Sequence, residues 1–200
     1  MTAGSERKSK SRALGQAAPT GEDPATVARL DFVSAMRNVV SGVAIITTLY
    51  ESRLWGMTVS AFTTVCADPP TLMVCVNSRT VLAAVLHEGS GFGVNVLSQD
   101  QEFLSRACAR PGTSKFLDSY VDLVDDGSSS GGLLLPTSVA AFDCVVSDAR
   151  TVGTHLVVLG AVREVTTSDR VPLLYGSGNY QCGTSDWAPD KAMHRALAWA

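Results

Sequence analysis

The chain has 200 residues, of which 46% are hydrophobic and 18% are charged, and its formal net charge is −3. This length and composition are typical of one soluble globular domain and exclude a wholly disordered chain. The weak negative charge provides no general attraction for nucleic acid or anionic lipid, and no apolar run approaches the roughly 18 residues that a membrane span requires.

The first 25 residues differ in composition from the rest of the chain. They are rich in Ser, Lys, Arg, Gly and Ala and hold no continuous apolar segment, so we expect a disordered leader over residues 1–25 rather than a secretory signal. Residues 26–200 are expected to form a single domain.

The cysteines and histidines show no metal-site pattern. Five cysteines are scattered along the chain and never occur in a Cys-x-x-Cys spacing, which argues against a disulfide framework and against a structural zinc site. The three histidines are far apart and have no carboxylate at the spacing of metal ligands. We therefore predict no metal and a reducing, cytoplasmic environment.

The first predicted elements are a helix and a strand. Hydrophobic residues recur at three- and four-residue steps over residues 24–40, which predicts a helix that ends at Ser41 and Gly42. Residues 43–50 follow as a β-branched run, which is typical of a buried strand.

The rest of the chain is organised around residues 56–70. Thr58, Ser60 and Phe62 alternate with larger or apolar neighbours, which predicts a strand with one polar side, and paired prolines at 69–70 end it. Such a strand could form the edge of a ligand cleft. The alternative is an ordinary half-exposed strand whose polar side chains face water.

Residues 71–76 predict another buried strand, and Asn77, Ser78, Arg79 and Thr80 follow it just before a helical pattern begins at Val81. A helix N-terminus with hydroxyl and arginine side chains beside it is a favourable place for a phosphate group. The alternative is that Ser78 or Thr80 merely caps the helix.

Asn95 lies in the middle of a predicted strand over residues 92–97, where a buried amide must be hydrogen-bonded either to neighbouring backbone or to a ligand. We predict a short helix over residues 99–109, a flexible Ser/Gly linker at 127–132, and a C-terminal helix over 188–200. His155 stands at the turn between two further strands. Six or seven strands with a few short helices fit a small barrel better than a βαβ sheet.

Taken in order, these segments resemble the flavin reductase-like family, the FMN-binding split-barrel reductases that serve two-component flavin monooxygenases. The similarity covers about residues 32–180. The matching segments are Ser41-Gly42-Val43, the strand of residues 56–62 with Asp68-Pro69-Pro70, residues 77–80, residues 92–97, Lys115-Phe116, Gly153-Thr154-His155 and residues 172–175.

The resemblance implies a mainly β fold, a Greek-key barrel with flanking helices that forms a homodimer. It implies that the isoalloxazine ring lies against Thr58, Val59, Ser60 and Ala61. The flavin phosphate is expected near Asn77, Ser78, Arg79 and Thr80, with Phe92, Asn95, Lys115 and Tyr175 also near the flavin. His155 matches the histidine of the family's Gly-Asp-His motif, which is associated with the nicotinamide.

The function that the resemblance implies is an NAD(P)H:flavin oxidoreductase, which reduces FMN or FAD by hydride transfer and supplies it to a separate monooxygenase. Thr154 stands where the family's motif has an acidic residue. This difference supports a second hypothesis, a non-catalytic or repurposed split barrel that binds flavin, haem or a metabolite without using NAD(P)H. A third hypothesis is an oxidase with tightly bound FMN. The sequence does not decide between FMN and FAD, or between NADH and NADPH.

Overall fold

The structure is a computed structural model that describes residues 29–118, 120 and 134–182. The predicted leader, the Ser/Gly linker at 127–132 and the C-terminal helix over 188–200 lie outside the described residues. No helix in the described part of the chain is long and apolar enough to cross a membrane.

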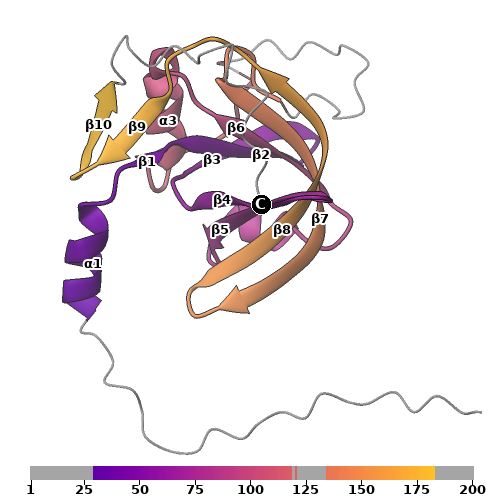
Figure 1. Cartoon of the computed structure of the whole chain (residues 1–200). Coiled ribbons are helices and arrows are strands. Elements are labelled where there is room, and N and C mark those ends of the chain that lie inside the picture. Colours follow the sequence, from indigo (N-terminus) through magenta and orange to yellow (C-terminus); the bar gives the residue numbers. More distant parts are fainter. Residues whose placement is uncertain (1–28, 119, 121–133, 183–200) are drawn as a thin grey trace, which may run out of the picture.

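Seven strands form one antiparallel sheet in the order β3-β2-β6-β7-β8-β5-β4. The sheet curves round into a barrel, and its longest strands, β7 and β8, form a hairpin that extends beyond the other strands (Figure 1). The strands are β2 (Ala44–Tyr50), β3 (Arg53–Val59), β4 (Phe62–Ala67), β5 (Pro70–Asn77), β6 (Gly91–Val96), β7 (Ala140–Val152) and β8 (His155–Thr167).

The barrel closes where β3 passes into β4. These two strands occupy opposite edges of the sheet, yet only Ser60 and Ala61 separate them in the chain. The predicted single strand through residues 57–62 is therefore wrong, because the chain leaves one edge of the sheet at Val59 and joins the other at Phe62. We call Ser60 and Ala61 the seam of the barrel.

The barrel interior holds the main hydrophobic core. Alternate residues of each strand point inward, as the period-two pattern requires. Gly160 of β8 is essential to this packing, since a Cβ built there would lie 2.4 Å from Cζ of Phe92. Fully buried members of the core include Ile46, Val74, Val76, Phe92, Val94 and Val158.

A second, smaller sheet covers one end of the barrel, in the order β1-β9-β10. It consists of β1 (Ser41–Gly42), β9 (Leu173–Gly176) and β10 (Asn179–Cys182). Beside it pack a 3-10 turn (Gln99–Gln101) and α3 (Glu102–Ala109), which confirm the predicted helix over residues 99–109. A second apolar cluster, including Ile45, Leu97, Leu104 and Leu173, joins α3 to the outer face of the barrel.

The helical pattern that begins at Val81 is confirmed as α2 (Val81–Val85), which has one turn, whereas the helix predicted over residues 24–40 ends earlier than expected, at Arg37. Residues 24–28 lie outside the described residues. α1 (Arg29–Arg37) has no buried residue and stands away from the barrel (Figure 1). The hydrophobic residues that give α1 its helical periodicity are therefore not buried against the rest of the described chain: Leu30 is 75% exposed and Phe32 is 60% exposed.

The described residues contain ten strands, more than the six or seven that the sequence pattern predicts. The additional strands are short pieces such as β1 and β10, which carry too few residues to show an alternation of their own. The prediction of a small barrel rather than a βαβ sheet is confirmed.

Candidate functional site

The seam is the centre of the candidate site. Val59, just before it, is buried, whereas Ser60 and Ala61 are exposed. Within the described residues, neither the N–H group of Ser60 nor that of Ala61 donates a hydrogen bond to another backbone group. Because these two residues belong to no strand, the seam offers backbone donors that the ladders do not use.

Thr58, two residues before the seam, offers a ligand fewer hydrogen-bond donors than the sequence suggests. Its side chain is half-buried, and its hydroxyl donates a 2.7 Å hydrogen bond to the carbonyl oxygen of Ser105 on α3. This bond anchors α3 to the end of β3. The hydroxyl proton of Thr58 is therefore engaged inside the protein.

Two neighbouring cavities lie in front of the seam. The larger, of about 590 Å³, lies between α1, the seam and the turn that joins β9 to β10. The smaller, of about 200 Å³, is bounded by Thr58, Val59, Ser60 and Ala109. Ser60 and Tyr175 line both cavities, so the two are adjoining parts of one cleft.

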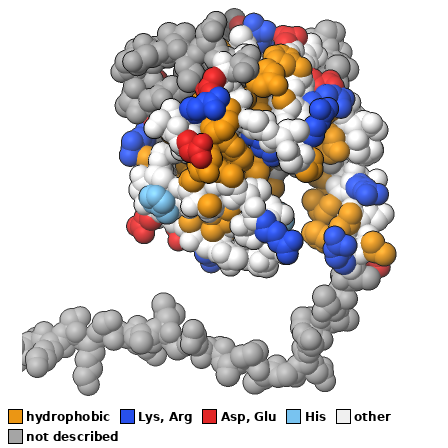
Figure 2. Space-filling model, turned by 180° about the vertical axis from the view of Figure 1, so that it is seen from behind, with side chains coloured by type: hydrophobic (Ala, Val, Ile, Leu, Met, Phe, Trp, Pro, Cys, Tyr) orange, Lys and Arg blue, Asp and Glu red, His pale blue; other side chains and the backbone are white. Residues whose placement is uncertain are grey.

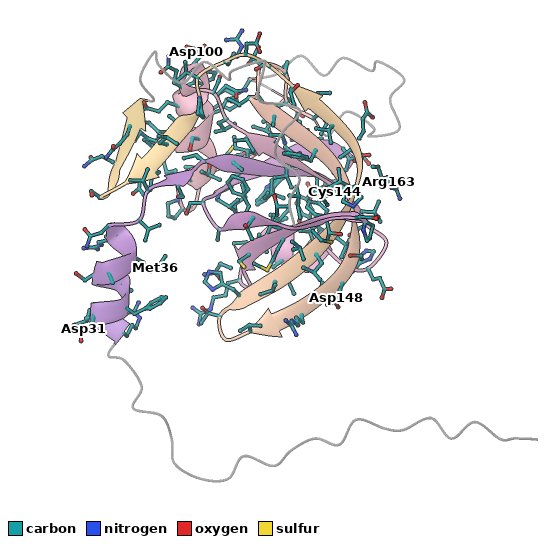
Figure 3. The ribbon with its side chains drawn as sticks, viewed as in Figure 1. Asp31, Met36, Asp100, Cys144, Asp148 and Arg163 are labelled. Carbon is teal, nitrogen blue, oxygen red and sulfur yellow. The ribbon has the colours of Figure 1, made fainter. Side chains whose placement is uncertain are left out.

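Hydrophobic side chains of α1, among them Phe32, Val33 and Met36, form one wall of the larger cavity, and the seam and residues 175–178 form other walls. Met36 projects from the side of α1 that faces the body of the protein (Figure 3). Seen from behind, exposed hydrophobic and basic side chains of α1 face the barrel across a hollow (Figure 2). Apolar walls with a few polar groups are typical of a site for an aromatic cofactor, and the volume is in the usual range for such sites.

The second predicted group, residues 77–80, lies next to the seam. The N–H group of Cys75 donates a 2.9 Å hydrogen bond to the carbonyl oxygen of Ala61, and Asn77 follows two residues later on β5. The structure thus brings the predicted ring-binding and phosphate-binding segments to the same end of the barrel.

Most donors of residues 77–80 are already used within the protein. The hydroxyl of Ser78 donates to the carbonyl oxygen of Thr154 at 3.0 Å, and the hydroxyl of Thr80 donates to that of Asn77 at 2.7 Å. Thr80 also accepts from the N–H group of Ala83 and so caps α2. The capping alternative is therefore correct for Thr80.

Two donors of this segment are left over. The guanidinium of Arg79 has no hydrogen bond or ion pair to any described residue, and Asn77 uses only its amide oxygen, which accepts from the N–H group of Arg79 at 2.9 Å. Both side chains are exposed. A phosphate at this place would consequently be bound by Arg79 and by the amide nitrogen of Asn77.

His155 lies beside the same segment, since it is the first residue of β8 and pairs with Asn77 of β5. The hydroxyl of Thr154 lies 3.0 Å from Nδ1 of His155, within hydrogen-bond distance. The threonine thus provides the ring with an orienting partner, although it brings no charge. Relative to the Gly-Asp-His motif, Thr154 lacks the carboxylate but retains an oxygen within hydrogen-bond distance of the histidine ring.

Phe92 and Asn95 do not join the group. Phe92 is fully buried in the barrel core. Asn95 is also fully buried, and its amide nitrogen donates to the carbonyl oxygen of Ile45 at 3.1 Å and to Oγ1 of Thr47 at 3.0 Å. Its amide oxygen accepts from the N–H group of Leu135 at 2.7 Å. Of the two alternatives for this amide, hydrogen bonding within the protein is the one observed.

Lys115 lies along β3 and is not among the residues that line the cleft, whereas Tyr175 lines both parts of it. The carbonyl oxygen of Lys115 accepts from the N–H group of Gly56, which holds its segment along β3, and the ammonium lies 5.8 Å from the ring centroid of Trp55. Burial lowers the pKa of the Lys115 ammonium. Tyr175 lines both parts of the cleft and is the predicted residue most clearly placed there.

Tyr180 is a candidate that the sequence did not reveal. Its ring packs edge-on against Tyr175 at 5.3 Å between centroids, and its hydroxyl lies 2.8 Å from Oγ of Ser105. It lines the smaller part of the cleft. The only available signal was the tyrosine at each end of a Gly-Ser-Gly-Asn turn, which suggests a hairpin with two rings on one face.

The buried cysteines are inert at neutral pH. Burial raises the pKa of the Cys108 thiol to about 11 and that of the Cys144 thiol to about 12. A nucleophile requires the thiolate. Both residues therefore serve as small core side chains.

Three comparisons bear on this site. A family model described as a flavin reductase like domain matches residues 36–184. The reductase component of the FADH(2)-dependent resorcinol hydroxylase of Rhizobium sp. (strain MTP-10005) is 37% identical over 158 residues, covering 78% of this chain and 87% of that protein. The flavin reductase (NADPH) of Lentzea aerocolonigenes is 34% identical over 170 residues, covering 83% and 94%.

Solved structures agree with these relatives. The NADH:FAD oxidoreductase SgcE6 of Streptomyces globisporus, solved in complex with NAD and FAD fragments, is 27% identical to this chain and superimposes with a TM-score of 0.68. It covers 84% of this chain, and this chain covers 99% of it. The predicted fold class, a mainly β split barrel with flanking helices, is thereby confirmed.

Replacing Asn95 tests its placement in the interior. Asn95→Ala removes a buried amide that three groups share, so we expect the free energy of unfolding to fall by about 3 kcal/mol. Urea denaturation measures the change, and exposed Asn38→Ala is the matched control, with an expected change within about 0.5 kcal/mol. Unchanged stability together with weaker flavin binding would instead place Asn95 in the site.

Proposed function

This chain belongs to the family of flavin reductase-like domains, and we propose that it is an NAD(P)H:flavin oxidoreductase that reduces FMN or FAD for a separate monooxygenase. The observation that carries the proposal is the meeting of the seam, residues 77–80 and His155 at one end of the barrel, beside an apolar cleft. The named activities of the relatives support it.

The cleft fits a flavin ring on two grounds. Its apolar walls come from α1 and Tyr175, and the seam presents unused N–H groups of Ser60 and Ala61. Backbone donors at the edge of the cleft favour a ring that becomes more electron-rich on reduction. When bound, the flavin supplies the redox chemistry, by accepting a hydride from the nicotinamide.

The protein's own part is binding and orientation. Arg79 and the amide of Asn77 would hold the flavin phosphate, since the hydroxyls of Ser78 and Thr80 are donated elsewhere. We propose that His155 positions the nicotinamide and that Thr154 orients its ring. Holding two rings face to face in one cleft supplies a large part of the rate gain that such an enzyme needs.

The exposed face of α1 supports a homodimer. A helix with no buried residue is not stable through packing within one copy, and its hydrophobic side chains form one wall of the cleft. A second copy that covers α1 would both bury this surface and close the site. Among the residues that the structure describes, cysteines 66, 75, 108 and 144 form no disulfide, which is consistent with a cytoplasmic enzyme.

Anaerobic mixing tests the function. The purified protein, mixed with NADH or NADPH and with FMN or FAD, is expected to bleach the absorbance of the oxidised flavin. His155→Ala is expected to raise the KM for the nicotinamide nucleotide more than the KM for flavin. Flavin binding without any nicotinamide oxidation would reject the reductase and support the non-catalytic alternative that Thr154 suggested.

Arg79→Gln tests the phosphate subsite. We expect FMN affinity to fall about tenfold, because a charge-assisted hydrogen bond is lost. Ser78→Ala is the matched control in the same turn and is expected to change the affinity less than about threefold. Fluorescence titration measures both, and equal losses in the two variants would contradict this assignment of donors.

The dimer is tested by molar mass. Light scattering after size exclusion should give twice the chain mass of 21.0 kDa. Phe32→Asp should shift the protein toward the monomer, because a charge would be buried in the contact. Phe103→Asp replaces another exposed aromatic residue, on α3, and should leave the mass unchanged. A wild-type monomer at micromolar concentration would overturn the proposal.

A further inference from the structure

A third cavity, of about 340 Å³, lies between α3 and the turn joining β9 to β10. Arg106 and Arg110 line it on one side, and Asn179 lines it on the other. It shares Ala109, Tyr175 and Tyr180 with the smaller part of the cleft in front of Thr58. The arginine cavity therefore continues the proposed flavin cleft along α3.

Arg106 is held in a defined position. Its guanidinium donates to Oε1 of Glu102, one turn earlier on α3, at 2.7 Å from Nε and 2.6 Å from Nη2. The guanidinium carbon also lies 4.6 Å from the centroid of the Tyr180 ring. These contacts use one edge of the guanidinium and one of its faces. Its remaining N–H groups have no hydrogen-bond partner among the described residues, and the side chain stays 61% exposed.

Arg110 is the uncompensated charge of the pair. It is exposed at the end of α3, and its guanidinium forms no hydrogen bond or ion pair with any residue that the structure describes. The cavity thus carries two guanidinium groups against the single carboxylate of Glu102. In a chain whose net charge is −3, this is a local positive site that opposes the general charge.

The chemistry of this cavity suits a phosphate-bearing ligand with a flat ring. Guanidinium groups bind phosphate oxygens through paired hydrogen bonds, and exposed tyrosine rings stack against nucleotide rings. The flavin phosphate already has candidate partners in Arg79 and Asn77, which lie beyond the seam. A different phosphate, next to the Thr58 side of the cleft, would occupy the arginine cavity.

We propose that Arg106 and Arg110 bind the phosphate groups of the nicotinamide dinucleotide and so hold the hydride donor against the flavin cleft. The proposal rests on the proposed function and adds a subsite to it. The donor then has two anchors: His155 at one end of the seam and the two arginines at the other. The sequence alone does not show this site, because Arg106 approaches the Tyr180 ring, and both arginines line a cavity with it, only in the folded chain.

The test compares Arg106→Gln, Arg110→Gln and the double variant with Arg170→Gln. Arg170 is an exposed, ion-paired arginine outside the three cavities described above. The double variant is expected to raise the KM for the nicotinamide nucleotide about 10- to 100-fold, with kcat and the FMN and FAD dissociation constants within about twofold. A larger increase in KM for NADPH than for NADH would show that the arginines bind the 2′-phosphate, and equal increases would show that they bind the pyrophosphate.

Two outcomes would overturn the proposal. One is an unchanged KM in the double variant; the other is a loss confined to FAD affinity, which would assign the cavity to the adenylate half of that flavin. Two variants are expected to fold normally. Arg106→Lys keeps a positive charge near the Tyr180 ring, and Arg110→Gln removes a guanidinium that has no partner among the described residues. Melting temperatures check this.

Inorganic pyrophosphate separates this proposal from the proposed function. Calorimetry should show that pyrophosphate binds the wild-type protein and that the double variant binds it at least tenfold more weakly. This measurement needs no turnover. If the wild-type protein fails to oxidise NAD(P)H, the reductase is rejected, whereas equal pyrophosphate binding by both proteins rejects the arginine subsite even when turnover is normal.

Discussion

The closure of the barrel at Ser60 and Ala61 is the constraint on which the rest of the site depends. Two consecutive strands lie on opposite edges of a seven-stranded sheet, so the two residues between them must cross the gap without a ladder partner. For this reason their N–H groups donate to no backbone acceptor in the part of the chain that the structure describes. The same crossing places β4 beside β5, and thereby brings residues 77–80 to the seam.

The internal hydrogen bonds decide which side chains remain for a ligand. Ser78, Thr80 and Thr58 have the residue types of a phosphate or ring site, yet each donates its hydroxyl proton to a carbonyl oxygen of the protein. Asn95 is satisfied on both sides of its amide. A buried or half-buried polar group that lacked a partner would cost stability, so the fold consumes these donors first. Exposed cations such as Arg79 are left over.

The two ends of the cleft are formed by elements that lie far apart in the sequence, so no local sequence pattern shows that they meet. α1 provides an apolar wall at one end, and α3 with the β9–β10 turn provides arginine and tyrosine at the other. The hydroxyl of Thr154 lies within hydrogen-bond distance of the His155 ring, so it can orient the ring without adding a charge. The proposed chemistry therefore needs accurate placement of two rings rather than a reactive side chain of the protein.

The sequence by itself determined the mainly β class, the short helix over residues 99–109, and the turn that presents His155. Local periodicity, prolines and glycines encode these features directly. It did not determine the break at the seam, because alternation continues through residues 57–62 whether or not the chain changes edges. Tertiary structure alone decided that Asn95 is internal, that α1 is exposed, and that Arg106 and Tyr180 meet, because each depends on contacts between segments distant in the chain.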